Sequence, residues 1–194
     1  MQPDTLAAAL LRWCERRGLK IACAESLTGG LLADAFVRVP GASKVFLGSA
    51  VTYDIKAKAR ILGVDRALLE REGAVHPEVA RQMAASTARL YAQPEYGGAI
   101  VGLSTTGVAG PGPDGDKPAG LVYAGISIPA APSIPDLLAP MRELPGSQGV
   151  VEDRDGRLTV AVELRLDGSR EQVRTRTVGS LLRIVSILTG ISQE

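Results

Sequence analysis

The sequence contains few of the residues that build metal-held or cross-linked frameworks. Cys14 and Cys23 are the only cysteines, and His76 is the only histidine. Structural zinc sites draw on several cysteine and histidine ligands, so these three residues cannot supply such a cluster. A disulfide framework also needs more cysteines than this chain has. We therefore expect neither a metal nor a cofactor.

The chain also lacks an excess of charge of either sign. Lysine and arginine number 22 against 21 aspartates and glutamates, which gives a formal net charge of +1. A nearly neutral chain creates no broad field for wrapping nucleic acid or for adhering to an anionic membrane. We expect a small-molecule partner, bound by local charges, and neither nucleic acid nor a membrane.

No long apolar run opens the sequence. Residues 1–18 mix apolar positions with charged ones such as Arg12, Glu15 and Arg16. This pattern excludes a signal-peptide core and a spanning helix over these residues. We accordingly expect a cytoplasmic protein.

The length of 194 residues suits one domain over residues 1–194. Hydrophobic spacing and turn residues predict its helices and strands. Helices are expected over residues 5–17, 31–39, 54–62, 65–72, 77–90 and from 169 onward, and strands over 20–24, 45–53, 99–104, 121–128 and 158–166. Continuous apolar strands alternating with helices indicate an α/β fold with helices on both faces of the sheet.

One segment breaks the pattern. Residues 129–150 are rich in proline and show little periodicity. Long connections of this kind are usually accessory or functional loops. We expect an insert over 129–150 that is mobile and lies outside the core, and we expect the strands on either side of it to pair without it.

The first candidate site is the segment 24–30, Ala-Glu-Ser-Leu-Thr-Gly-Gly. It follows a strand and precedes a helix, where backbone N–H groups stabilise anions or developing oxyanions. Ser26 is then a candidate nucleophile, and Thr28, Gly29 and Gly30 are candidate substrate contacts. The spacing alone is equally consistent with Ser26 or Thr28 serving only as a helix cap.

The second candidate site is the glycine-rich segment 104–113. It contains Thr105, Thr106 and Gly107 directly after a buried strand, and its glycines allow a ligand to approach the backbone. A long connection rich in turn residues would look the same. Neither segment matches a P-loop or a dinucleotide-binding fingerprint.

Charged and aromatic candidates lie at other element ends. Tyr53 and Lys58 flank the start of a helix, where a lysine opposes the helix dipole, although a solvated lysine is the simpler interpretation. Arg170 and Arg174 lie one turn apart near another helix start and could hold a phosphate. His76 precedes Pro77, the position of a helix cap, so we assign it a structural role.

At these residues the chain closely resembles the carboxy-terminal domain of the competence-damage protein CinA. The resemblance covers most of residues 5–128 and again 158–189. It is carried by the following segments: Ala24 to Gly30, Val51-Thr52-Tyr53, Ala57-Lys58, Leu62-Gly63-Val64, Gly73-Ala74-Val75, Thr106 to Pro111 and Pro118 to Tyr123.

The resemblance implies a single three-layer α/β/α domain with a central mixed sheet, a cytoplasmic location and a homodimer. It implies hydrolysis of nicotinamide mononucleotide to nicotinate mononucleotide and ammonia, because stand-alone members of the family are deamidases of that nucleotide. By position it makes Ser26 the nucleophile, assisted by Tyr53 and Lys58. It also places substrate contacts at Thr106 and at one of the pair Arg170 and Arg174.

The chain departs from the family pattern at several positions. Leu27 stands where many relatives have cysteine, which argues against a required thiol. Asp54-Ile55 replaces a segment that commonly contains asparagine, and Ser169 replaces the usual aspartate. Residues 129–150 are longer than the corresponding connection. The amino-terminal molybdopterin-binding-like domain of longer relatives has no counterpart in these residues.

Together these residues favour metal-free amide hydrolysis, in which neutral Lys58 accepts the proton of Ser26 and Tyr53 orients or relays it. Backbone N–H groups after Ser26 would hold the oxyanion. Two alternatives stay open: a non-catalytic nucleotide-binding or assembly module, and a hydrolase of another nucleotide such as a pyrophosphatase. The latter usually needs an acidic metal cluster, which the sequence does not suggest.

Overall fold

The computed structural model describes residues 3–131, 133–153 and 156–191. Its centre is a six-stranded mixed sheet in the order β2-β1-β3-β4-β6-β5. The strands are β1 (Lys20–Glu25), β2 (Phe46–Val51), β3 (Ile100–Gly107), β4 (Leu121–Ile128), β5 (Ser147–Glu152) and β6 (Leu158–Arg165). The α-helices are α1 (Pro3–Arg16), α2 (Leu31–Val37), α3 (Ile55–Leu62), α4 (Arg66–Glu72), α5 (Pro77–Leu90), α6 (Leu138–Glu143) and α7 (Arg170–Leu188).

The sheet has a parallel half and an antiparallel half. Strand β1 pairs in parallel with β2 and with β3. Strands β3, β4, β6 and β5 then pair antiparallel in that order. The carboxyl ends of β1, β2 and β3 therefore meet at one edge of the sheet, which is where α/β folds commonly place their ligand sites.

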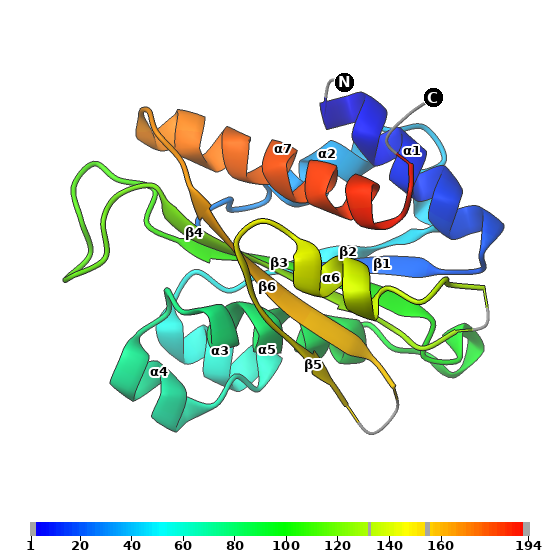
Figure 1. Cartoon of the computed structure of the whole chain (residues 1–194), viewed down its shortest axis with the longest axis horizontal. Coiled ribbons are helices and arrows are strands. Elements are labelled where there is room, and N and C mark those ends of the chain that lie inside the picture. Colours follow the sequence, from blue (N-terminus) through cyan, green and yellow to red (C-terminus); the bar gives the residue numbers. More distant parts are fainter. Residues whose placement is uncertain (1–2, 132, 154–155, 192–194) are drawn as a thin grey trace.

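Helices cover both faces of the sheet, as expected for this fold (Figure 1). Helices α1, α2 and α7 lie on one face, while α3, α4 and α5 lie on the other. The main core lies under the first group and includes Leu10, Phe36 and Leu181. A smaller apolar cluster, including Ala24, Leu62 and Met83, lies under the second group. The predicted α/β class with helices on both faces is confirmed.

The helix starts follow the capping residues of the sequence. The carboxylate of Asp54 accepts a hydrogen bond from the Ala57 N–H at the start of α3. His76 Nδ1 accepts the N–H of Glu78 and so caps α5, which confirms its structural assignment. Ser169 and Gln172 form the reciprocal capping box of α7. These caps fix where each helix leaves the edge of the sheet.

The prediction for residues 129–150 is wrong in most respects. The segment contains α6 and most of β5, and β5 is the edge strand of the sheet, paired with β6. Leu137, Met141 and Leu144 are buried in the main core, so the segment is not an external loop. Pro132 lies outside the described residues. The expected pairing of β4 with β6 is confirmed.

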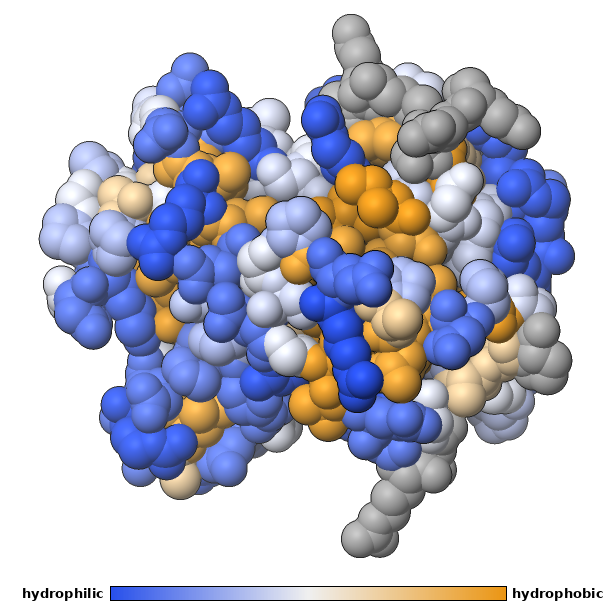
Figure 2. Space-filling view, viewed as in Figure 1, coloured by the Kyte–Doolittle hydropathy of each residue, from blue (hydrophilic) through white to orange (hydrophobic). Residues whose placement is uncertain are grey.

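The missed helix has a visible surface consequence. Figure 2 shows apolar surface where α6 approaches the carboxyl end of α7. A shallow hollow of about 250 Å³ lies there, and Leu144, Ile187 and Leu188 are among its lining residues. Residues of α6 and of the carboxyl end of α7 therefore border the same hollow.

None of the described helices combines the length and the apolar character needed to cross a lipid bilayer.

Candidate active site

The alternation of side chains along β1 separates two neighbouring polar residues. Cys23 packs with the α1, α2 and α7 core, and Ala24 packs against the cluster on the α3–α5 face. The Ser26 N–H donates to the carbonyl of Thr105, so the pairing with β3 continues one residue past β1. The period of two therefore directs Glu25 towards α2 and the Ser26 hydroxyl towards α3.

Lys58 meets the Ser26 hydroxyl from α3. Its Nζ lies 3.0 Å from Ser26 Oγ, 2.5 Å from the carbonyl oxygen of Thr52 and 3.1 Å from the carbonyl oxygen of Tyr53. The Lys58 side chain is fully buried, and Ser26 is 8% exposed. Both carbonyls follow β2 and approach the amine from the same segment. The predicted pair is thus brought together in the fold.

Burial changes the acid–base behaviour of Lys58. Desolvation lowers the pKa of its amine from 10.5 to about 8, and the Asp54 carboxylate opposes this shift. About one tenth of such an amine is neutral at pH 7, against roughly 0.03% at the ordinary value. A neutral amine has two N–H groups and one lone pair. The two carbonyls can accept the N–H groups, which leaves the lone pair for the hydroxyl proton of Ser26.

The turn after Ser26 offers two backbone donors. Within the described residues, no hydrogen bond engages the N–H groups of Leu27 and Thr28. Arg174 holds this turn through its carbonyls: Nε donates to Leu27 O at 2.9 Å and Nη2 to Thr28 O at 3.1 Å. The N–H and C=O of a trans peptide point in opposite directions, so the Thr28 N–H points away from Arg174.

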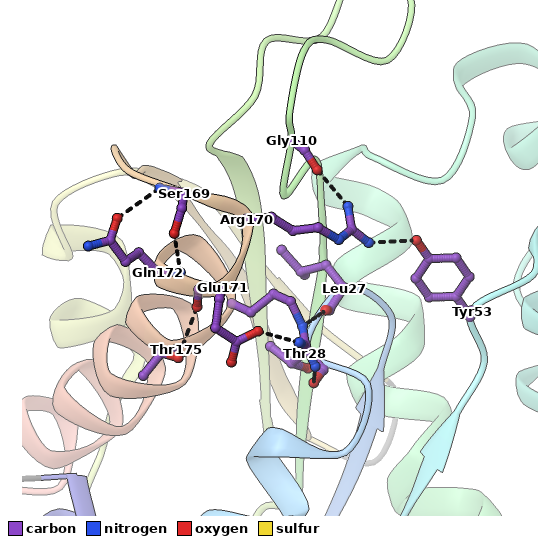
Figure 3. Close-up of polar contacts among 10 residues, drawn as sticks. Leu27, Thr28, Tyr53, Gly110, Ser169, Arg170, Glu171, Gln172 and Thr175 are labelled. Carbon is purple, nitrogen blue, oxygen red and sulfur yellow. Dashed lines mark hydrogen bonds and ion pairs between the residues drawn. The ribbon is translucent and has the colours of Figure 1, made fainter.

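Arg170 occupies a different position from Arg174. Its Nη1 donates to the carbonyl of Gly110 at 2.6 Å and its Nη2 to the hydroxyl of Tyr53 at 3.1 Å. Figure 3 shows its guanidinium between these two groups, which come from separate loops. Arg170 is exposed, whereas Arg174 is committed to two carbonyls and to Glu171 at 2.5 Å. The structure therefore favours Arg170 as the arginine available to a ligand.

Tyr53 does not lie where a proton relay would place it. Its phenol is bonded to Arg170, and the residue is 63% exposed. Lys58 contacts the carbonyl of Tyr53 and not its hydroxyl. The expected contact between the phenol and the Ser26–Lys58 pair is therefore wrong in this structure. Tyr53 instead connects the base to the arginine, one through its backbone and the other through its side chain.

The predicted threonine contacts are internal. Thr28 and Thr105 are fully buried and share a hydrogen bond of 2.8 Å between their hydroxyls. Thr106 is also fully buried, and its hydroxyl donates to the carbonyl of Ala74 at 2.7 Å. Strand β3 runs on to Gly107, so Thr105 and Thr106 belong to the sheet and not to a loop. Their hydroxyls position elements and are not presented to a ligand.

Glycine is required at these turns for two different reasons, backbone conformation and lack of space. Gly29 and Gly30 adopt φ of 54° and 103°, the left-handed region that disfavours other residues. A Cβ at Gly107 would approach the carbonyl of Leu121 and the backbone of Val122 to 2.7 Å. The Gly30 N–H donates to Glu25 and is therefore not available to an oxyanion. Gly29 remains exposed at the tip of the turn.

Sequence reasoning missed Glu25. Its carboxylate is fully buried beside the turn that carries Ser26. The available signal was a charged residue directly after the apolar run Ile21 to Ala24, because charged residues are rarely buried without a purpose. It also missed Thr52, whose carbonyl holds Lys58 and whose buried hydroxyl has no hydrogen-bond partner within the described residues.

The other candidate chemistries have less support from the geometry. Burial, reinforced by Glu25, raises the pKa of the Cys23 thiol well above 9.0, which keeps it protonated. The described residues contain no group of three or more histidine, cysteine, aspartate or glutamate side chains that could hold a metal ion.

Two hollows of about 610 and 550 Å³ lie away from this site. One lies beside residues 128–138 and the other between α3 and α4, and neither is lined by Ser26 or Lys58.

Residues 3–138 match the model of the CinA C-terminal domain family. The chain belongs to this family. It is 38% identical over 176 residues to a putative competence-damage inducible protein of Caldanaerobacter subterraneus subsp. tengcongensis, covering 90% of this chain and 35% of that protein. It is 40% identical over 190 residues to a CinA-like protein of Frankia casuarinae, covering 97% of this chain and 36% of that protein. The chain thus spans about a third of the length of these curated relatives.

Solved structures of the CinA superfamily share the fold. A competence/damage inducible protein from Agrobacterium tumefaciens superposes with a TM-score of 0.73 at 30% identity, covering 96% of this chain and 94% of that one. A competence damage-inducible protein from Klebsiella pneumoniae superposes with a TM-score of 0.76 at 23% identity over the whole of both chains, a likeness of fold alone.

Proposed function

We propose that this CinA-family domain is an amidohydrolase that converts nicotinamide mononucleotide to nicotinate mononucleotide and ammonia. The observation that carries the proposal is the buried amine of Lys58, 3.0 Å from the Ser26 hydroxyl and held by two backbone carbonyls. A serine with a desolvated lysine as its base can attack an amide without further side chains. The choice of nucleotide rests on the resemblance to the deamidases of the family.

In the first half-reaction, neutral Lys58 takes the proton of Ser26 while Oγ attacks the carboxamide carbon. The carbonyl oxygen becomes an oxyanion, which the N–H groups of Leu27 and Thr28 stabilise. The ammonium of Lys58 then gives its proton to the departing nitrogen, and the C–N bond breaks. The products are ammonia and an ester of the nicotinoyl group with Ser26.

In the second half-reaction, the same groups act on water. Lys58, neutral again, takes a proton from a water molecule that attacks the ester carbon. The oxyanion forms a second time, and Ser26 leaves with the proton from Lys58. Nicotinate mononucleotide departs, and the enzyme returns to its starting state. All the proton transfers use one base.

The phosphate of the substrate is assigned to Arg170. Its guanidinium is exposed, and it bridges Gly110 and Tyr53 with only part of its donor set in use. A fork of N–H donors suits a phosphate, and rearrangement of the Tyr53 contact frees Nη2 for it. We assign the enzyme to the cytoplasm, to recycling of pyridine nucleotides, and to a homodimer as its working state.

The test is ammonia release from a small panel in the presence of a chelator: nicotinamide mononucleotide, nicotinamide riboside, nicotinamide and glutamine. We expect turnover of the mononucleotide to exceed that of the others, with nicotinate mononucleotide as the product. Binding of the mononucleotide without ammonia above the enzyme-free control would replace the proposal with a nucleotide-binding module.

A further inference from the structure

A carboxylate without a cationic partner lies directly behind the proposed nucleophile. Glu25 is fully buried, and within the described residues no lysine or arginine forms an ion pair with it. Burying a carboxylate is costly unless hydrogen bonds replace its water shell. Five donors do so here: Oε2 accepts from Thr28 Oγ1 at 2.7 Å, Gly30 N at 2.9 Å and Leu32 N at 3.1 Å, while Oε1 accepts from Ala33 N at 3.0 Å and Ser49 Oγ at 2.8 Å.

Three of these donors are backbone N–H groups at the start of α2. The first N–H groups of a helix have no partner within the helix, and together with the helix dipole they favour an anion. Glu25 supplies that anion from the preceding strand. The terminus is therefore filled by the protein itself, and a ligand phosphate placed there would meet a like charge.

The same carboxylate fixes the turn that carries Ser26. The Thr28 hydroxyl donates to Glu25, so the Thr105 hydroxyl must supply the proton of the 2.8 Å contact between the two threonines. This chain of hydrogen bonds ties the turn to β3. Arg174 holds the opposite side of the turn through the carbonyls of Leu27 and Thr28. The turn is thus anchored from within the fold and from α7.

We propose that Glu25 is a positioning residue that serves as the built-in anion of the α2 terminus. It holds residues 26–30 so that the Ser26 hydroxyl and the free N–H groups of Leu27 and Thr28 keep the arrangement used in catalysis. The catalytic part of this inference rests on the proposed deamidase function.

The first test compares Glu25→Gln with Ser49→Ala. The glutamine keeps the size of the side chain, but it replaces one acceptor with a donor that faces N–H groups. We expect kcat to fall on the order of a hundredfold, because small misplacements of reacting groups have effects of that size. KM should stay within about twofold and the acid limb of the pH profile should keep its midpoint, because the phosphate contact and Lys58 are untouched.

Ser49→Ala removes one of the five donors and leaves the charge and the helix contacts in place, so its kcat should stay within about threefold of wild type. A folded Glu25→Gln enzyme with unchanged kcat would overturn the inference. So would a variant in which only KM rises, because that pattern would place Glu25 in substrate binding.

The second test needs no turnover and therefore separates this inference from the proposed function. Glu25→Ala leaves a cavity at the α2 terminus with several unpaired donors, which formate can fill. We expect formate, at matched ionic strength against chloride, to raise the melting temperature of Glu25→Ala and not that of wild type. If formate stabilises both proteins equally, or neither, the carboxylate is not the anion of that terminus. Absence of deamidation by wild type would instead reject the proposed function alone.

Discussion

The amine of Lys58 lies 3.0 Å from the hydroxyl of Ser26, although the two residues are 32 positions apart in the chain. The contact exists because Ser26, the residue after β1, is directed towards α3 and because the segment after β2 holds Lys58 by two carbonyls. Those carbonyls can accept hydrogen bonds from the amine whether it is protonated or neutral. Only desolvation makes the neutral form accessible near neutral pH.

The first prediction concerns the pH dependence of the reaction. Because burial lowers the pKa of Lys58 to about 8, the free enzyme gains its base as the pH rises through that value. We expect kcat/KM for nicotinamide mononucleotide to rise about tenfold per pH unit well below 8 and to level off above it. A profile that is flat between pH 6 and pH 9, although chemistry limits the rate, would remove Lys58 as the base.

The second prediction is that the free energy of unfolding depends on pH through the same Lys58 pKa. Below pH 8 Lys58 is protonated in both the folded and the unfolded chain, so the cost of burying its charge is fully present. Between 8 and 10.5 the folded state has released the proton that the unfolded state still binds, so the free energy of unfolding rises with pH. From pH 7 to pH 10 this contribution amounts to about 2–3 kcal/mol.

Lys58→Met lacks this titration and serves as the reference. Urea unfolding of both proteins at pH 7 and pH 10 cancels the contributions of all other groups. Wild type should gain about 2–3 kcal/mol relative to the variant over that interval. If the free energies of unfolding of wild type and Lys58→Met differ by the same amount at both pH values, Lys58 has the same pKa in the folded and the unfolded chain.

The third prediction separates the two arginines. Arg170→Ala should raise KM for nicotinamide mononucleotide with little change in kcat, and it should leave the low turnover of nicotinamide riboside unaffected, because that substrate has no phosphate. Arg174→Ala should lower kcat for both substrates and destabilise the fold by about 1–3 kcal/mol, because it frees the carbonyls of Leu27 and Thr28. The opposite pattern would exchange the two roles.

The fourth prediction concerns the segment around α6. Met141 is fully buried in the main core, so Met141→Ala should destabilise the domain by about 2–5 kcal/mol. Replacing residues 137–146 with a short Gly/Ser linker should abolish cooperative unfolding, whereas Pro140→Ala, at an exposed position, should have little effect. A linker variant with the melting curve of wild type would show that the segment is dispensable.

The sequence allowed much of the fold to be predicted because the signals were local. Capping at Asp54, His76 and Ser169 depends on neighbouring backbone N–H groups, and β4 was predicted at its observed bounds. Helix α6 was missed because its apolar residues are few and lie among prolines, so only packing against α7 and the sheet reveals it. Edge strand β5 is largely exposed, with weak alternation.

The reacting residues of the site could be predicted from the sequence, but the burial and the partners of the other site residues could not. The family resemblance predicts that Ser26 and Lys58 act together, and the fold brings them into contact. The burial of Thr105 and Thr106 was not visible, because their position depends on how far β3 extends beside β4. The partner of Tyr53 lies on α7, 117 residues away, so no local pattern could indicate it.

The central claim is that Ser26 is the nucleophile, and turnover by Ser26→Ala tests it most directly. The matched control is Cys23→Ala, three positions earlier on β1, whose protonated and buried thiol takes no part in the mechanism. With folding verified by circular dichroism and a chelator present, ammonia release from nicotinamide mononucleotide should fall to the enzyme-free rate in Ser26→Ala and stay near the wild-type rate in Cys23→Ala. Turnover by Ser26→Ala close to that of wild type would contradict the account.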